Sequence, residues 1–117
     1  METKDAAVAL AALAHEGRLG IFRILVATGP AGLAAGDIGR RLDLAPSTLS
    51  ASLTLLSHAG LVQSRRSGRS IIYAARFDRM GELMAFLAED CCGGAPEVCG
   101  PVAAAAQRAA CRPAAVC

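Results

Sequence analysis

Three cysteines lie within nine residues in the last third of the chain: Cys91, Cys92 and Cys99, here called the cysteine cluster. Neighbouring residues on an α-helix do not face each other, so Cys91 and Cys92 can share one ligand only where the helix unwinds. Gly93 and Gly94 follow them and permit such unwinding. The extended chain from Cys92 to Cys99 spans up to about 23 Å, so Cys99 can fold back to the other two thiols without a second subunit. The spacing predicts a site of three thiolates.

The donor atoms of this site select its occupant. Thiolates prefer soft centres, and zinc normally takes a fourth ligand that the cluster does not supply. Three thiolates around trivalent arsenic or antimony are formally neutral. Around a divalent metal they keep a negative charge beside Glu89 and Asp90, at the negative end of a helix. We therefore expect trivalent arsenic or antimony to bind here as a transient ligand, with no permanently bound cofactor.

Other interpretations of the cysteines stay open. A lone cysteine is usually a small apolar residue that fills a gap, but three so close together beside glycine and proline favour that role less. The same thiols could act as a redox sensor by forming disulfides. A thiol enzyme or metal carrier that handles arsenic is a weaker hypothesis, because no histidine lies near the cysteines to act as a base. Cys111 and Cys117 either add to the site or are dispensable tail residues, and the second interpretation is favoured.

Composition limits the kind of protein that positions these thiols. The chain has 117 residues, of which 54% are hydrophobic, 19% charged and 3% aromatic. These values exclude a multidomain enzyme and a disordered tail, and they favour one small α-rich domain. No stretch approaches the ~18 apolar residues of a membrane span, and the first residues lack the basic start of a signal peptide. We expect a cytoplasmic protein with free thiols, in which residues 1–92 form the folded domain and residues 93–117 a Gly-, Pro- and Ala-rich tail that contributes cysteines to the site.

Hydrophobic periodicity predicts helices at residues 6–14, 18–28, 37–42, 46–59 and 79–90. The second of these helices is apolar nearly all round and should be the buried central helix. Pro46 fits the first position of the fourth helix, and Asp78 is the expected N-cap of the last. Two β-branched runs, at 61–66 and 69–74, flank a turn that contains Gly68 and predict a β-hairpin. The predicted fold class is mainly α with a small β-hairpin, and the Ala-rich tail receives no predicted structure.

The helix that begins at Pro46 combines an apolar set of side chains with a set rich in hydroxyl groups. The residues expected to face the core are Leu49, Leu53, Leu55 and Leu56. The residues expected to face outward are Ser47, Thr48, Ser50, Ala51, Ser52 and Thr54. Small hydroxyl groups allow close approach to DNA and can bond bases or phosphates. Taken alone, this pattern is equally typical of a solvated helix face.

Positive charge is concentrated on the hairpin and the residues that follow it. Between residues 61 and 79, five arginines oppose one aspartate and give a charge of +4, and because the whole chain carries +2, the remainder carries −2. Arg65, Arg66 and Arg69 surround Gly68 at the hairpin tip, where guanidinium groups can lie on phosphates or enter a minor groove. Taken alone, the arginines are equally consistent with a soluble turn.

The order of these elements is more specific than any one of them. A helix, a short helix, a turn, a second helix and a basic hairpin follow one another as in a winged helix-turn-helix, whose second helix enters the major groove of DNA. The segments that carry a family resemblance are residues 17–25 (GRLGIFRIL), 44–50 (LAPSTLS), 58–62 (HAGLV) and 68–73 (GRSIIY). Through them, residues 6–90 resemble the ArsR/SmtB family of metal- and metalloid-responsive repressors.

The resemblance implies a homodimer that joins through its first and last helices. It also implies repression by binding operator DNA, relieved when an inducer binds. The residues expected to contact DNA are Ser47, Thr48, Ser50, Ser52, Arg65, Arg66 and Arg69. Ala51 and Ser52 stand where family members commonly carry a bulky residue and His or Gln, so fewer base contacts are available.

The family resemblance also bears on the inducer site. Some members bind their inducer through a Cys-x-Cys pair in the short helix, but residues 35–40 hold no thiol. Others bind zinc through His and acids of the last helix, but His15 and His58 lie elsewhere and are expected at the polar surface or at helix ends. The cysteine cluster resembles the C-terminal three-thiol site of one arsenic-responsive branch. That likeness implies trivalent arsenic, antimony or a trivalent methylarsenical as the inducer.

Overall fold

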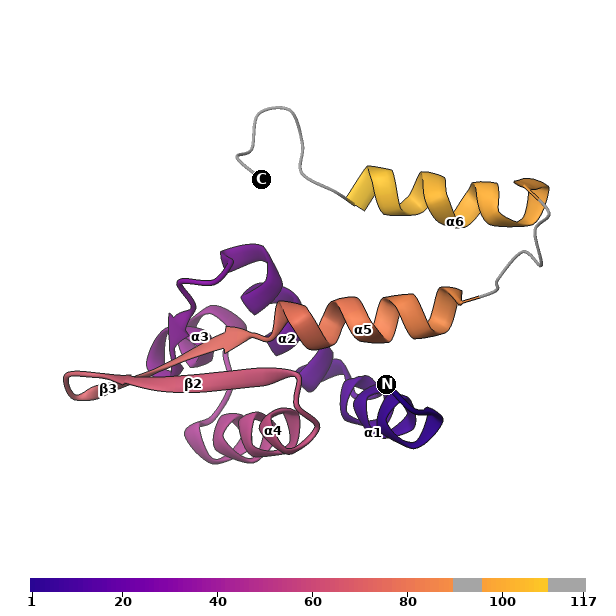
Figure 1. Cartoon of the computed structure of the whole chain (residues 1–117). Coiled ribbons are helices and arrows are strands. Elements are labelled where there is room, and N and C mark those ends of the chain that lie inside the picture. Colours follow the sequence, from indigo (N-terminus) through magenta and orange to yellow (C-terminus); the bar gives the residue numbers. More distant parts are fainter. Residues whose placement is uncertain (90–95, 110–117) are drawn as a thin grey trace. The chain divides into compact units, whose positions relative to one another are not determined.

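The computed structural model describes the backbone of residues 1–89 and 96–109 (Figure 1). Within these ranges the elements follow in the order α1 (Thr3–Leu13), α2 (Glu16–Thr28), β1 (Leu33–Ala34), α3 (Ala35–Leu42), α4 (Pro46–His58), β2 (Val62–Ser67), β3 (Ser70–Ala75), α5 (Phe77–Ala88) and α6 (Pro96–Ala109). The fold is mainly α with one small antiparallel sheet, which confirms the predicted fold class.

The chain divides into two compact units, Met1–Leu83 and Met84–Cys117. The first unit contains α1 to α4, the sheet and the beginning of α5, and α6 belongs to the second. The domain boundary predicted after residue 92 falls within residues 90–95, outside the described residues, and stays a prediction. In the described ranges, no helix is both long and apolar enough to cross a membrane.

The core of the first unit is built around α2, as its apolar composition predicted. Ile21 and Leu25 of this helix are fully buried, and α2 contacts α1, α3, α4 and β3. Ile38 of α3 and Leu56 of α4 are also fully buried. Each fully buried aliphatic side chain stabilises the fold by about 1.5–3 kcal/mol. This packing fixes the helix-turn-helix and the sheet to one scaffold.

Helix α1 packs through its smallest side chains. Ala6, Ala9 and Ala12 are its buried residues, and their spacing of three places them along one face. Alanine side chains allow the helix to approach α2 and α4, both of which it contacts. The larger Val8 and Leu10 are exposed instead.

A histidine begins the central helix. His15 is the N-cap of α2, and its Nδ1 accepts hydrogen bonds from the backbone N–H groups of Gly17 (3.1 Å) and Arg18 (3.4 Å). These bonds satisfy donors that a helix start leaves without an intrahelical partner. The prediction that His15 lies at a helix end is confirmed. Arg18 in turn donates from Nε to the Ala12 carbonyl oxygen (2.6 Å), near the end of α1.

The sheet has the strand order β1-β3-β2, with both pairs antiparallel. The predicted hairpin is confirmed as β2 and β3, which join through a turn at Gly68, whose φ of 62° suits glycine. Strand β1 lies between the helices predicted at 18–28 and 37–42, in a segment for which the sequence predicted no strand, because two residues are too few to show a periodicity. A Cβ on Gly32, which precedes β1, would overlap the Tyr73 carbonyl oxygen, so glycine permits this close approach to β3.

The turn between α3 and α4 is three residues long, from Asp43 to Ala45. Asp43 adopts the left-handed conformation (φ 53°), and the backbone N–H of Leu44 donates to the Gly39 carbonyl oxygen (3.0 Å). These features end α3 in the way common for helix C-termini. Pro46 then occupies the first turn of α4, as predicted. The two helices form the expected helix-turn-helix pair.

One prediction about the last elements is wrong, because helix α5 begins at Phe77 and Asp78 therefore lies in its first turn rather than at its N-cap. The tail, for which no structure was predicted from the sequence, contains α6 between Pro96 and Ala109. Alanine is the strongest helix former, and the Ala-rich composition of this segment was the available signal.

Candidate nucleic-acid interface

Helix α4 turns four residues toward the core. Leu49, Leu53 and Leu56 are buried there, as predicted, and Ser52 joins them with only 6% of its surface exposed. Ser52 lies three residues after Leu49 and four before Leu56, a spacing that places all of them on one helix face. The prediction that Ser52 faces outward is wrong, and in this fold its hydroxyl is not presented to DNA.

The opposite side of α4 is polar and exposed. The exposed residues in its first two turns are Pro46, Ser47, Thr48, Ser50 and Ala51. The Thr54 hydroxyl donates to the Ser50 carbonyl oxygen (2.9 Å), so its hydrogen is used within the helix. Leu55, predicted to face the core, is 49% exposed. Of the residues of this helix expected to contact DNA, Ser47, Thr48 and Ser50 are therefore the exposed ones.

The hairpin separates its arginines onto two faces of the sheet. Arg66 pairs with Ile71 and Arg65 with Ile72. Directly paired residues lie on the same face, and successive residues of a strand lie on opposite faces. Arg65 and Arg66 therefore belong to opposite surfaces of the hairpin.

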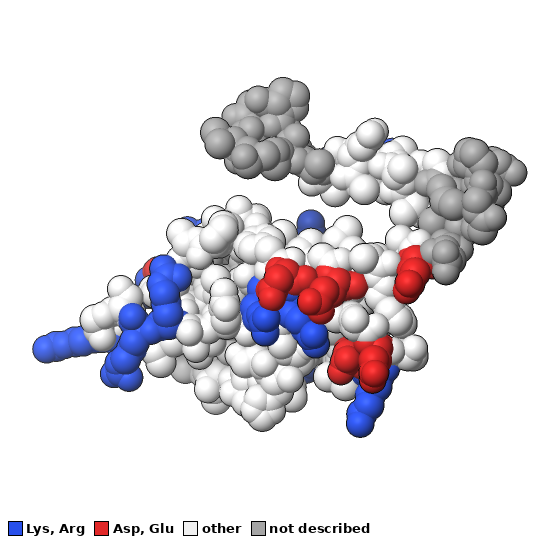
Figure 2. All heavy atoms as spheres, in the orientation of Figure 1, with Lys and Arg blue, Asp and Glu red and all other residues white. Residues whose placement is uncertain are grey.

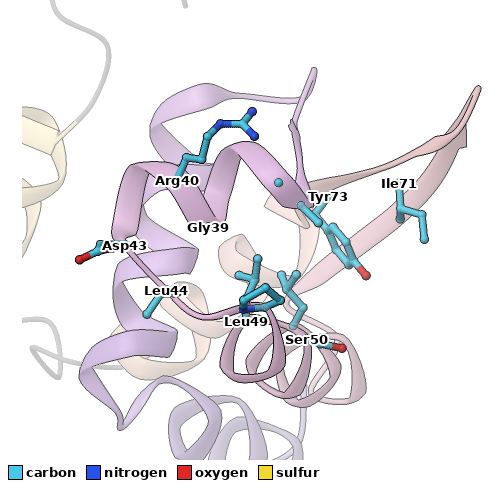
Figure 3. Close-up of a pocket in the computed structure, with 12 residues that line it drawn as sticks. Gly39, Arg40, Asp43, Leu44, Leu49, Ser50, Ile71 and Tyr73 are labelled. Atoms are coloured by element: carbon cyan, nitrogen blue, oxygen red, sulfur yellow. The ribbon is translucent and has the colours of Figure 1, made fainter.

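A groove joins the Arg66 face of the sheet to the helix-turn-helix. It has a volume of about 570 Å³, and Ile71 and Tyr73 of β3 form one wall of it. Leu49 and Ser50 of α4 line another wall (Figure 3). The Arg66 side of the hairpin thus faces the same space as the exposed hydroxyl of α4.

The other hairpin face holds Arg65. Its guanidinium Nη2 donates to the Ala31 carbonyl oxygen (2.9 Å), in the loop that precedes β1. This bond ties β2 to the far side of the sheet, because β3 lies between β1 and β2. Arg69 lies in the exposed turn beside Gly68. The DNA contact predicted for Arg65 is therefore less favourable than those predicted for Arg66 and Arg69, because its guanidinium already bonds the backbone.

The remaining arginines of the basic segment are paired with acids. Arg76 bonds Asp78 (2.7 Å), and Arg79 bonds Glu82 (3.2 Å). The hydrogen bond from Arg76 holds the pKa of Asp78 below its ordinary value. Figure 2 shows blue side chains at the hairpin end of the molecule and a second blue group in direct contact with red ones. The positive charge of this segment that is not paired with acids in the described residues is therefore concentrated on the hairpin.

The residues that line the groove without having been predicted as contacts include Tyr73 and Arg40. The Tyr73 side chain extends from β3 toward Ser50 in Figure 3. Arg40 of α3 lines the same space and forms an ion pair with Asp37 of its own helix. The alternation of Ile71 and Tyr73 along the strand was the signal that could have found Tyr73.

The cysteine cluster falls largely outside the described residues. Cys91 and Cys92 lie in the range 90–95, and Cys99 lies in α6 but its side chain is not among those described. The predicted three-thiolate site therefore stays a prediction. Among the side chains that are described, no group of three His, Cys, Asp or Glu could hold a metal ion. His58 is the last residue of α4 and is exposed, which confirms its predicted place at a helix end.

Comparison with known proteins bears on this arrangement. A family described as a helix-turn-helix domain matches residues 13–65. The chain is 34% identical over 80 residues to the Biofilm growth-associated repressor of Agrobacterium fabrum, a match that covers 68% of this chain and 66% of that protein. An ArsR-like transcriptional regulator from Rhodococcus sp. RHA1 matches in structure with a TM-score of 0.65 and 28% identity, over 93% of this chain and 96% of that one.

A second solved structure decides the family. It is the homodimeric winged helix-turn-helix DNA-binding domain of a possible ArsR-family transcriptional regulator from Mycobacterium bovis, 31% identical with a TM-score of 0.60, over 74% of this chain and 81% of that one. The chain belongs to the ArsR family. This ArsR protein is a DNA-binding transcriptional regulator with a winged helix-turn-helix fold, and it is not an enzyme. In this fold α4 is the recognition helix and the β2–β3 hairpin is the wing.

Proposed function

We propose that this ArsR protein is a homodimeric repressor that binds operator DNA and releases it when trivalent arsenic or antimony binds the cysteine cluster. The observation that carries the DNA-binding part is the shared orientation of two surfaces. The exposed hydroxyls of α4 and the Arg66 face of the wing border one groove. A helix in the major groove and a basic hairpin on the adjacent backbone can therefore contact one DNA duplex together.

The exposed apolar residues support the homodimer. Val8 and Leu10 of α1 are 50% and 42% exposed, and Met84 and Leu87 of α5 are 49% and 58% exposed. Exposed apolar residues on α1 and on α5 match the interface implied by the family resemblance, and their burial in a dimer would be favourable. The related Mycobacterium bovis domain is described as homodimeric. Two copies place two recognition helices on a palindromic operator.

The proposal that an inducer binds the cysteine cluster is supported by the position of these cysteines in the sequence. Cys91 follows the last residue of α5, Ala88, by three positions. If the three thiolates gather around one trivalent centre, the chain at the end of this proposed dimer helix must change course. The two recognition helices must sit about 34 Å apart on DNA, so a small change in dimer geometry lowers operator affinity. A coupling of about 1–3 kcal/mol would weaken DNA binding by a factor of roughly 5 to 150.

The experiment is an operator-binding titration of the full chain with and without arsenite. We expect reduced protein to bind DNA as a dimer and to release it with about one arsenite per subunit. Mass spectrometry of the released protein separates the two sensing hypotheses. An arsenic adduct supports the metalloid sensor, whereas the loss of two hydrogens after treatment with oxidant, together with release by oxidant but not by arsenite, supports the thiol redox sensor.

A further inference from the structure

An apolar groove lies between α1 and the C-terminal half of α4, within the first unit of the chain. Its volume is about 300 Å³. The residues that line it are Val8, Ala11, Ala12, Arg18, Leu55, His58 and Ala59. None of these residues lines the groove beside the wing.

The exposure of Leu55 indicates that this groove is a binding surface. Its neighbours Leu53 and Leu56 are 3% and 0% exposed, whereas Leu55 is 49% exposed. A single exposed leucine is common in soluble proteins. Here Val8, which is 50% exposed, lines the same hollow from another helix. Adjacent exposed aliphatic residues around a hollow are typical of an interaction surface.

The only arginine in the groove is already bonded. Arg18 donates from Nε to the Ala12 carbonyl oxygen (2.6 Å) and from Nη2 to the Ala11 carbonyl oxygen (3.5 Å). Its charge thus lies at the C-terminal end of α1, where the helix dipole favours a cation. Apart from Arg18 and His58, the lining side chains are apolar. An apolar protein surface therefore fits this groove better than an anionic ligand does.

We propose that a second copy of this chain occupies the groove, so that α4 takes part in the dimer contact as well as in DNA binding. This inference rests on the homodimer of the proposed function. Helix α1 belongs to the proposed dimer interface and also lines the groove, so the two surfaces are continuous. A twofold interface uses the same patch on both subunits and needs both a projection and a hollow. Val8 and Leu10 project from α1, and the small Ala11 and Ala12 leave the hollow.

The position of Leu55 gives this contact a role in DNA binding. Leu55 lies one helical turn after Ala51, on the recognition helix itself. Contact with the partner at Leu55 would fix the angle of α4 relative to the other recognition helix. The dimer contact and the surface expected to meet DNA would then lie one turn apart on one rigid helix, with no intervening element to transmit a change.

The test is the oligomeric state of the full chain, measured by sedimentation velocity over a dilution series. Leu55→Gln keeps a good helix former and removes the apolar contact. We expect it to raise the dimer dissociation constant at least about tenfold, because burying a leucine in each subunit is worth more than this factor. Ala11→Gln should fill the hollow and act in the same direction. Leu19→Gln is the matched control, since Leu19 of α2 is 42% exposed and does not line the groove.

The variants should keep the parent's circular dichroism spectrum and urea midpoint, because Leu55 and Ala11 are exposed in the protomer. A Leu55→Gln protein with the parent's dissociation constant would overturn the inference, while operator binding by the parent dimer would leave the proposed function standing. A parent that is monomeric at every concentration would overturn both. A parent dimer that Leu55→Gln dissociates, but that binds no operator DNA, would support the groove contact and overturn the repressor.

Discussion

Arg65 and Arg66 are adjacent in β2, yet they serve opposite faces of the wing. Arg66 shares its face with Ile71 and Tyr73, which line the groove beside α4, while the Arg65 guanidinium bonds the Ala31 carbonyl oxygen at 2.9 Å. The sequence alone predicts the same role for both arginines, because they are neighbours in one basic segment. Because successive residues of a strand point to opposite faces, Arg66 lies on the groove side of the sheet and Arg65 on the other side.

The first prediction follows from this separation. Arg66→Ala should weaken operator binding and lower the magnitude of the slope of log affinity against log salt by roughly 0.9, the value for one lost phosphate contact. Arg65→Ala, the matched control, should leave that slope within error of the parent. Fluorescence anisotropy titrations at several salt concentrations measure both. Equal slope changes in the two variants would contradict the assignment of faces.

The second prediction concerns the buried serine. Ser52→Ala should bind operator DNA as tightly as the parent, because Ser52 is only 6% exposed and faces the core with Leu49 and Leu56. Ser50→Ala should bind more weakly, by about 1 kcal/mol if its hydroxyl bonds DNA. Anisotropy at fixed salt compares them. Loss of affinity in Ser52→Ala without loss of thermal stability would return Ser52 to the DNA surface.

The third prediction concerns the cap of the central helix. His15→Ala should lower the free energy of unfolding by roughly 0.5–2 kcal/mol, because two backbone N–H groups lose their acceptor. His15→Asn should retain most of the stability, since asparagine is a good N-cap. Urea denaturation with a common m-value measures the difference. An unchanged midpoint in His15→Ala would show that the imidazole contributes nothing to the start of α2.

The fourth prediction is a pH dependence. The hydrogen bond from Arg76 lowers the pKa of Asp78 below 3.8, so the folded state favours the carboxylate. The stability from this pair is present above pH 3.8 and is lost as the pH falls through the lowered pKa. Asp78→Asn should therefore flatten the fall in stability below about pH 4, as measured by thermal unfolding between pH 2 and 7.

The fifth prediction tests the cysteine cluster. Cys91→Ser and Cys92→Ser should bind operator DNA normally but should no longer release it with arsenite. Cys99→Ser should lose the response to arsenite and keep a response to a methylated trivalent arsenical, which offers only two positions to thiolates. Cys111→Ser and Cys117→Ser should respond like the parent. If Cys111→Ser alone abolishes release, the inducer site belongs to the tail.

The fold was predictable where one structural rule dominates. Pro46 predicted the start of α4, and Gly68 predicted the turn of the hairpin. The apolar residues of α2 predicted that this helix forms the core. The errors lie where a position depends on its partners. Leu55 is exposed and Ser52 is buried, the reverse of what is usual for these residue types. The contacts of α4 with α1, α2 and the sheet decide which of its residues face the core.

The candidate site was predictable as a set of elements but not in its individual contacts. Residue type alone predicted that the hydroxyl groups of α4 and the arginines of the wing belong to the site. Only the strand register distinguished Arg66 from Arg65, and only the fold showed that Arg76 is paired with Asp78. Charge counted along a sequence includes both paired and free guanidinium groups, so it overstates the charge that a polyanion meets.

The burial of Ser52 limits how this repressor can choose its operator. In its first two turns, the recognition helix is left with exposed hydroxyl groups at Ser47, Thr48 and Ser50, and each of these can donate or accept a hydrogen bond. Such groups tolerate several base pairs, whereas a bidentate arginine or amide side chain rejects most of them. Discrimination among sites in a genome would then depend on DNA shape and on the distance between half-sites. Operators of this protein should vary in base sequence more than in spacing.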